Sequence, residues 1–128
     1  MALAPARPEL EATNRSVRLD TSKLVAELCD MLGTRLVAFI GGVSETRAVR
    51  EWAAAQRSPR DDTEARLRFT FVVAKLIAEE ESPRIARTWL MGLNPQLDDH
   101  SAAGLIRDGD LHDVRPRILA AARAFVAS

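Results

Sequence analysis

The stretch LVAFIGGVSETRAVREW, residues 36–52, decides the fold of this chain. Ala38 provides the small side chain that a helix needs where a second helix crosses it closely. Gly42 follows four residues later, and glycine readily takes the positive φ of a tight turn. Val43 then supplies an apolar side chain that fills the space between two helices. This spacing predicts a helix-turn-helix whose first helix covers residues 34–40.

The second helix of this motif is expected over residues 45–55. Ser44 is its expected N-cap, because a serine hydroxyl accepts a hydrogen bond from a free backbone N–H of the first turn. Val49 and Trp52 lie one turn apart and are expected to anchor the helix in the core. The apolar anchor of the second helix falls one residue later than in the commonest helix-turn-helix spacing. The turn or the start of this helix must therefore accommodate one extra residue.

The outer face of this second helix carries polar and basic side chains near its N-terminus, where recognition helices meet the major groove of DNA. Arginine pairs with guanine edges, and threonine contacts a thymine methyl group or a phosphate. Arginines in the following loop are suited to phosphate binding. The candidate DNA-binding residues are Ser44, Thr46, Arg47, Arg50, Arg57 and Arg60. The alternative interpretation is an ordinary helical hairpin whose arginines are solvated.

Helix is also expected in most of the remaining chain. There is no tyrosine, no convincing alternation of apolar and polar residues, and an abundance of strong helix formers such as alanine, leucine, arginine and glutamate. Asp20, Thr21 and Ser22 are all competent to cap an amphipathic helix that ends at Leu32. Asp61 and Glu64 form a capping-box pattern at the start of the longest helix, which is expected to reach about Glu80.

Three further helices are expected over residues 83–91, over residues 102–107, and from residue 111 or 114 to the C-terminus. Ser82 and Ser101 precede the first two of these and are suitable N-caps. The side chains expected to face inwards on the helix 83–91 are Ile85, Ala86, Trp89 and Leu90.

The chain is therefore expected to be all-α, with a long helix joining two halves. Residues 1–19, which contain Pro5 and Pro8 and show no periodicity, are expected to form a mostly disordered tail. Residues 20–80 are expected to form the helix-turn-helix domain, and residues 81–128 a second, smaller helical module.

Composition narrows the class of protein. The chain has 128 residues, is 47% hydrophobic and has a formal net charge of zero, so any basic surface must be local. Its one cysteine, Cys29, fits a buried apolar position and a reducing compartment. No apolar run approaches the ~20 residues that span a bilayer, and the first residues lack the pattern of a signal peptide. A soluble, cytoplasmic protein is expected.

Chemistry-bearing residues are sparse. His100 and His112 are the only histidines, and with a single cysteine they form no zinc-type ligand pattern. The run Asp98-Asp99-His100 is typical of a solvated loop beside a helix. We expect no catalytic site, no metal and no cofactor, which disfavours a small helical enzyme.

The C-terminal half carries a recognisable pattern: TWLM at residues 88–91, LNPQL at 93–97, AGLIRDG at 103–109, and then Val114. Over residues 24–128 the chain resembles the Xre/MbcA/ParS antitoxin family, and most of all its mycobacterial MbcA-type branch. Members of that family have a tryptophan on a short helix, an Asn/Pro/Leu turn, a short helix that ends in an acidic-Gly step, and a terminal helix.

This resemblance implies a type II antitoxin. An Xre-like N-terminal domain would bind operator DNA and repress its own operon, while the C-terminal domain would bind a RES-domain toxin, an enzyme that consumes NAD. The C-terminal end, residues 125–128, would block the active-site cleft of the toxin. The candidate toxin-binding residues are Trp89, Met91, Asn94, Pro95, Arg107, Phe125, Val126 and Ser128. For Trp89, ordinary core packing remains open.

The implied partners are the toxin encoded by the adjacent gene and operator DNA, in a homodimer or a larger toxin–antitoxin hetero-oligomer, without a membrane. The second interpretation is a stand-alone helix-turn-helix regulator with a helical dimerisation domain. A RES-domain reading frame beside the gene would favour the antitoxin.

Overall fold

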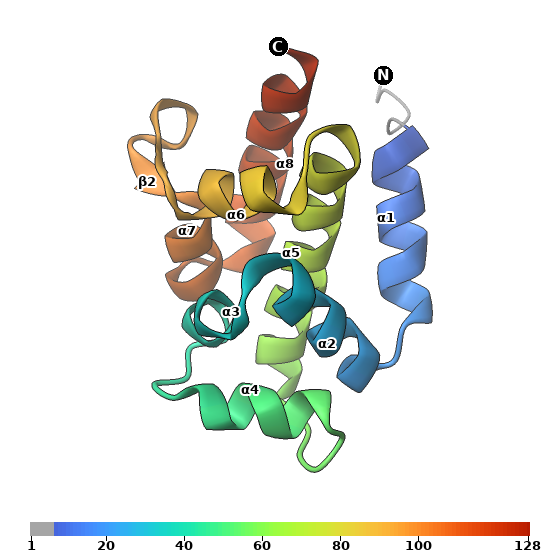
Figure 1. Cartoon of the computed structure of the whole chain (residues 1–128). Coiled ribbons are helices and arrows are strands. Elements are labelled where there is room, and N and C mark those ends of the chain that lie inside the picture. The colour runs from blue at the N-terminus through green and yellow to red at the C-terminus, as the bar shows by residue number, and fades with distance from the viewer. Residues whose placement is uncertain (1–6) are drawn as a thin grey trace.

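The computed structural model describes residues 7–128, which form eight α-helices, a single 3-10 turn and a short two-stranded hairpin (Figure 1). The helices are α1 (Arg7–Arg18), α2 (Thr21–Leu32), α3 (Thr34–Ile40), α4 (Thr46–Ala53), α5 (Asp61–Glu80), α6 (Pro83–Met91), α7 (Ala102–Asp108) and α8 (Leu111–Ala127). The hairpin consists of β1 (Leu93–Asn94) and β2 (His100–Ser101), separated by the 3-10 turn Pro95–Leu97. The expected all-helical fold is confirmed.

Helix α5 is the centre of the fold. Every residue from Phe69 to Ala74 is buried, and six consecutive residues cover all sides of a helix that turns once every 3.6 residues. Helices α1, α6 and α8 pack around α5, and Figure 1 shows α1 on one side of it with α6 and α8 on the other. The long helix expected between the two halves is therefore the central helix of the core.

One hydrophobic cluster joins helices α2 to α8. It includes Leu24 and Leu28 of α2 as well as Leu90 of α6 and Ile118 of α8. Helix α2 packs against α6, and α3 packs against α7. Residues 20–80 and 81–128, which the sequence analysis treated as two modules, therefore share a single core.

The expected disorder of residues 1–19 is wrong for the part that the structure describes. Residues 7–18 form α1, which lies along α5 and buries Ala12 and Ser16. Small side chains on this face allow the two helices to approach closely, whereas the sequence offers no strong apolar stripe there. The carboxylate of Glu9 is only 5% exposed and forms an ion pair with Arg123 of α8. Residues 1–6 lie outside the described residues.

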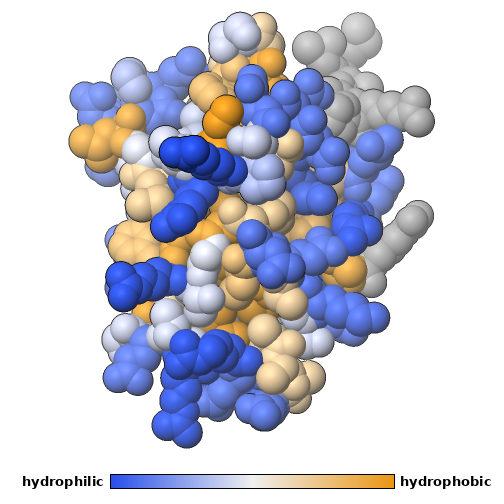
Figure 2. All heavy atoms as spheres, in the orientation of Figure 1, coloured by the Kyte–Doolittle hydropathy of each residue, from blue (hydrophilic) through white to orange (hydrophobic). Residues whose placement is uncertain are grey.

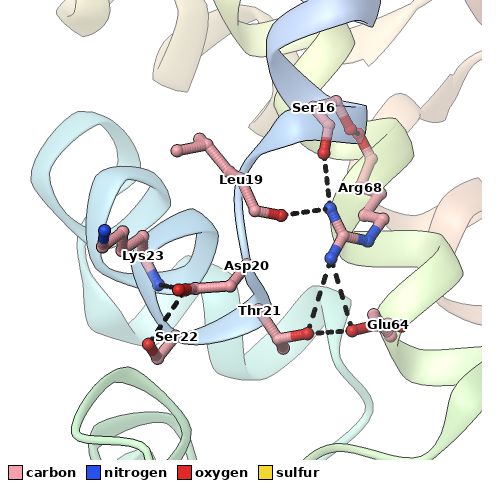
Figure 3. A network of polar contacts seen from close by, with 8 residues as sticks. All are labelled: Ser16, Leu19, Asp20, Thr21, Ser22, Lys23, Glu64 and Arg68. Atoms are coloured by element: carbon pink, nitrogen blue, oxygen red, sulfur yellow. Dashed lines mark hydrogen bonds and ion pairs between the residues drawn. The ribbon is translucent and has the colours of Figure 1, made fainter.

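Arg68 fixes the end of α1 to α5. Its guanidinium group donates hydrogen bonds to the carbonyl oxygens of Ser16 and Leu19, the latter at 3.0 Å (Figure 3). It also contacts Thr21 and Glu64, whose hydroxyl and carboxylate bond to each other. Carbonyl groups at a helix C-terminus have no partner within the helix. A cation from a neighbouring helix therefore satisfies them and closes α1 against the core.

The helix caps agree with the sequence at three positions. The Asp20 carboxylate accepts a hydrogen bond from the Lys23 N–H at 3.0 Å, and this bond lowers the pKa of Asp20. The Ser82 and Ser101 hydroxyls accept hydrogen bonds from N–H groups in the first turns of α6 and α7.

The capping box expected at the start of α5 is wrong. Arg60 is the N-cap and makes no side-chain capping bond, whereas Asp61 lies inside the first turn with Asp62 and Glu64. These carboxylates still favour the helix through its positive N-terminal dipole.

We predict that Arg68→Ala will expose the end of α1. Ser16 and Leu19 would lose the donor to their carbonyl oxygens, and leaving such groups unpaired costs about 2 kcal/mol. Urea unfolding should show a loss of that order, and amide hydrogen exchange should accelerate in residues 10–19. Arg60→Ala is the control, because the Arg60 side chain is 85% exposed. Unchanged exchange in α1 would contradict the role assigned to Arg68.

Candidate functional site

The first candidate surface is built on α3, α4 and the turn between them. Gly42 has a φ of +73°, as the sequence analysis expected. The Val43 N–H donates to the carbonyl oxygen of Ala38 at 3.1 Å, and the Gly42 N–H donates to that of Phe39 at 3.1 Å. Ala38 is buried. These bonds hold the end of α3 and the turn together.

Helix α4 is anchored to the core by Val49 and Trp52, which are both buried. The Trp52 ring lies against the backbone of Gly41, where an added Cβ would come within 3.2 Å of it. The extra residue in the spacing is accommodated by a turn of five residues, 41–45, before α4 begins at Thr46. Ser44 was expected to be the N-cap of this helix, and this expectation is wrong. Glu45 occupies that position in an extended conformation and makes no side-chain capping bond.

The exposed face of α4 brings several predicted residues together. An open hollow of about 580 Å³ is lined by Ser44, Arg47 and Arg57 among others. A neighbouring hollow of about 440 Å³ is lined by Arg47 and Arg50. Arg60 lines neither hollow and pairs with Asp62.

Acidic residues that the sequence analysis left aside also belong to this surface. Glu51 lines both hollows and pairs with Arg47 at 3.0 Å, while Glu45 lines the larger one. Arg50 instead donates to the Thr46 hydroxyl at 2.8 Å. The surface is therefore a mixed one, in which the side chain of Arg47 remains 80% exposed.

The second candidate surface is a mainly apolar groove between α6, β1 and the end of α8. It has a volume of about 350 Å³. The rings of Trp89 and Phe125 lie side by side within it, with centroids 6.2 Å apart and planes tilted by 41°. The groove is lined by Arg84, Ile85, Thr88, Trp89, Gly92, Leu93, Asn94 and Phe125.

The groove exists because α6 carries more apolar residues than it can bury. Ala86 and Leu90, four residues apart, are fully buried and direct one face of the helix into the core. Ile85 and Trp89 lie one position earlier in each turn and flank the groove. The expectation that Ile85 faces inwards is therefore wrong, since it is 36% exposed, and Trp89 is only half-buried.

The hairpin extends this apolar surface. Leu93 is 76% exposed and Met91 is 53% exposed. Leu93 pairs with Ser101 in the two-stranded ladder, and the Asn94 side chain accepts a hydrogen bond from the Gln96 N–H at 2.9 Å. Figure 2 shows apolar surface over the hairpin and over the C-terminal end of α8, with strongly hydrophilic side chains between them.

Three of the eight candidate toxin-binding residues line this groove, namely Trp89, Asn94 and Phe125. Arg107 lies elsewhere, with its guanidinium carbon 4.6 Å from the centre of the Phe39 ring and its head group beside Asp108.

The remaining candidates are not in the groove lining either. Met91 is exposed, Pro95 begins the 3-10 turn, Val126 is half-buried, and the Ser128 hydroxyl donates to the Phe125 carbonyl oxygen. Five residues of the lining were not expected to belong to a site: Arg84, Ile85, Thr88, Gly92 and Leu93. The signal that was available was the excess of large apolar residues on a helix of nine residues.

Within residues 7–128, no group of three or more His, Cys, Asp and Glu side chains is placed to hold a metal ion. No helix of the described chain has both the length and the apolar character needed to cross a bilayer. His100 directs its Nδ1 atom at the Leu97 carbonyl oxygen, 3.1 Å away, within the hairpin.

Comparison with protein-family models, with curated proteins and with solved structures finds no match to this chain. The two surfaces described above are therefore the features from which a function can be inferred.

We predict that Gly42→Ala will destabilise the protein by about 1 kcal/mol, the cost of placing a Cβ in the left-handed region. An added Cβ would meet nothing within 4 Å, so the loss would report backbone strain alone. Gly42→Asn should recover part of the stability, because asparagine enters this region more easily. Urea unfolding of the three proteins measures the effect. Equal stability of all three would show that the turn does not need a positive φ.

Proposed function

We propose that this protein is an antitoxin that binds operator DNA through α4 and binds a RES-domain toxin, an NAD-consuming enzyme, through the groove of α6, β1 and α8. The observation that carries the proposal is the groove itself. A tilted Trp89–Phe125 pair, half-buried and bordered by the highly exposed Leu93, is an apolar surface of the kind that marks a protein-binding site.

Two features support the DNA-binding half of the proposal. The side chain of Arg47 is 80% exposed near the N-terminus of α4, and Arg50 is exposed one turn further along the helix. The anchors Val49 and Trp52 fix the helix so that these arginines face away from the core. Short recognition helices present arginines to the major groove in this way.

The toxin-binding half of the proposal is supported by the position of the C-terminus. Helix α8 continues to Ala127, and Figure 1 shows its end projecting from the molecule on the side opposite α4. The contact between Phe125 and Trp89 joins the last turns of α8 to α6. In the proposed complex this end enters the active-site cleft of the toxin, and the groove contacts the rim of the cleft.

For the DNA-binding half, we predict that the double variant Arg47→Ala/Arg50→Ala will weaken operator binding about tenfold or more, because each arginine paired with a base contributes about 1–3 kcal/mol. Electrophoretic mobility shift with the promoter region of the gene measures this effect. The matched control is Arg84→Ala/Arg87→Ala, which removes the same charge from α6. Equal operator affinity of both double variants and the parent would refute the assignment of α4.

For the toxin-binding half, we predict that Leu93→Asp will abolish neutralisation of the toxin while the protein remains folded, because Leu93 is 76% exposed. A charge at this place would oppose burial in the complex. The measurement is growth of cells that co-express the adjacent RES-domain reading frame, together with co-purification. Leu10→Asp is the control, since Leu10 is 48% exposed on α1.

If the Leu93→Asp variant restores growth as well as the parent protein does, the groove is not the toxin-binding site. If the gene has no RES-domain neighbour and the purified protein binds only operator DNA, the protein is a stand-alone regulator and not an antitoxin.

A further inference from the structure

Helix α6 carries two arginines, one in the lining of the groove and one beside it, that have no partner within the described chain. Arg84 lines the groove and Arg87 follows three residues later, so both lie on neighbouring positions of the same helix. Both are exposed, and neither makes a hydrogen bond or an ion pair with another described residue.

The size of the groove limits what it can hold. A volume of about 350 Å³ gives room for about two large apolar side chains and not for the whole face of a helix. The floor is formed by Trp89 and Phe125, which offer aromatic surface to such side chains.

One wall of the groove is a strand. Gly92, Leu93 and Asn94 line it, and β1 pairs with β2 along one edge only. The second edge of β1 has no strand partner in residues 7–128. An open strand edge beside an apolar groove is the arrangement that takes an extended peptide as an additional strand.

We propose that the groove binds an extended acidic-apolar peptide segment, in which about two large apolar side chains enter between Trp89 and Leu93 and neighbouring Asp or Glu side chains pair with Arg84 and Arg87. That this segment belongs to the toxin rests on the proposed function. The acidic and apolar character of the segment does not rest on the proposed function, because it is inferred from the groove alone.

A second copy of this chain is the competing occupant, and the charges disfavour it. A two-fold axis through the groove would bring the Arg84 and Arg87 pairs of both copies close together, and like charges across an interface are unfavourable.

The test uses dye-labelled synthetic peptides in which phenylalanine and leucine are flanked by aspartate, with matched peptides that carry asparagine or lysine in place of aspartate. Fluorescence anisotropy on the full chain should show binding of the aspartate peptide and weakening by salt. The double variant Arg84→Glu/Arg87→Glu should bind this peptide about tenfold more weakly and should gain affinity for the lysine peptide. Arg47→Glu/Arg50→Glu, which changes the same charge on α4, should leave both affinities unchanged.

Equal affinity for the aspartate and asparagine peptides, or no affinity for any of them, would overturn the inference. So would a dimer in sedimentation equilibrium that Leu93→Asp dissociates, since a second copy would then fill the groove. The two proposals fail separately. If Leu93→Asp abolishes toxin neutralisation but Arg84→Glu/Arg87→Glu does not, the toxin site stands and the acidic segment is refuted. If the peptides behave as expected and no toxin is neutralised, the groove chemistry stands and the antitoxin proposal falls.

Discussion

The burial of α5 on every side is the constraint on which the other features of this structure depend. Six consecutive buried residues from Phe69 to Ala74 require neighbours all round the helix, and α1, α6 and α8 supply them. Burial of this kind contributes roughly 25 cal/mol per Å² of apolar surface. The chain around α5 therefore has little freedom in where it places α6 and α8, and the groove between them is a consequence of that packing.

The same core places the two candidate surfaces apart from each other. Figure 1 shows α4 at one end of the molecule, and the hairpin with the end of α8 towards the other. Two ligands bound at these surfaces would not collide within one copy of the chain. An antitoxin that represses its operon while it holds a toxin requires this separation, so the arrangement is compatible with the proposed double role.

Local signals in the sequence were sufficient for much of the fold. Ser82 and Ser101 mark helix starts through hydrogen bonds to residues three positions away, and Gly42 marks a turn through its own φ. The sequence did not indicate the long-range interactions. Helix α1 is held by the contacts of Arg68 with Ser16 and of Arg123 with Glu9, which join residues 52 and 114 positions apart. No local pattern indicates such pairs.

Only part of the candidate sites could be predicted from the sequence, again because long-range contacts leave no local pattern. Trp89, Asn94 and Phe125 were named and do line the groove, whereas Ile85 was assigned to the core and Arg107 to the partner surface. Which side chains of a short helix are buried depends on the elements that cover it, here α2, α5 and α7. Periodicity shows that α6 has an apolar face but not how much of that face the rest of the chain covers.

Hydrogen–deuterium exchange of this chain, free and bound to the protein of the adjacent reading frame, tests the central claim most directly. The account predicts slower exchange in residues 84–94 and 123–128 on binding, and unchanged exchange in residues 46–53. Protection confined to α4, or spread over α1 and α2 with none in α6 and the hairpin, would contradict it.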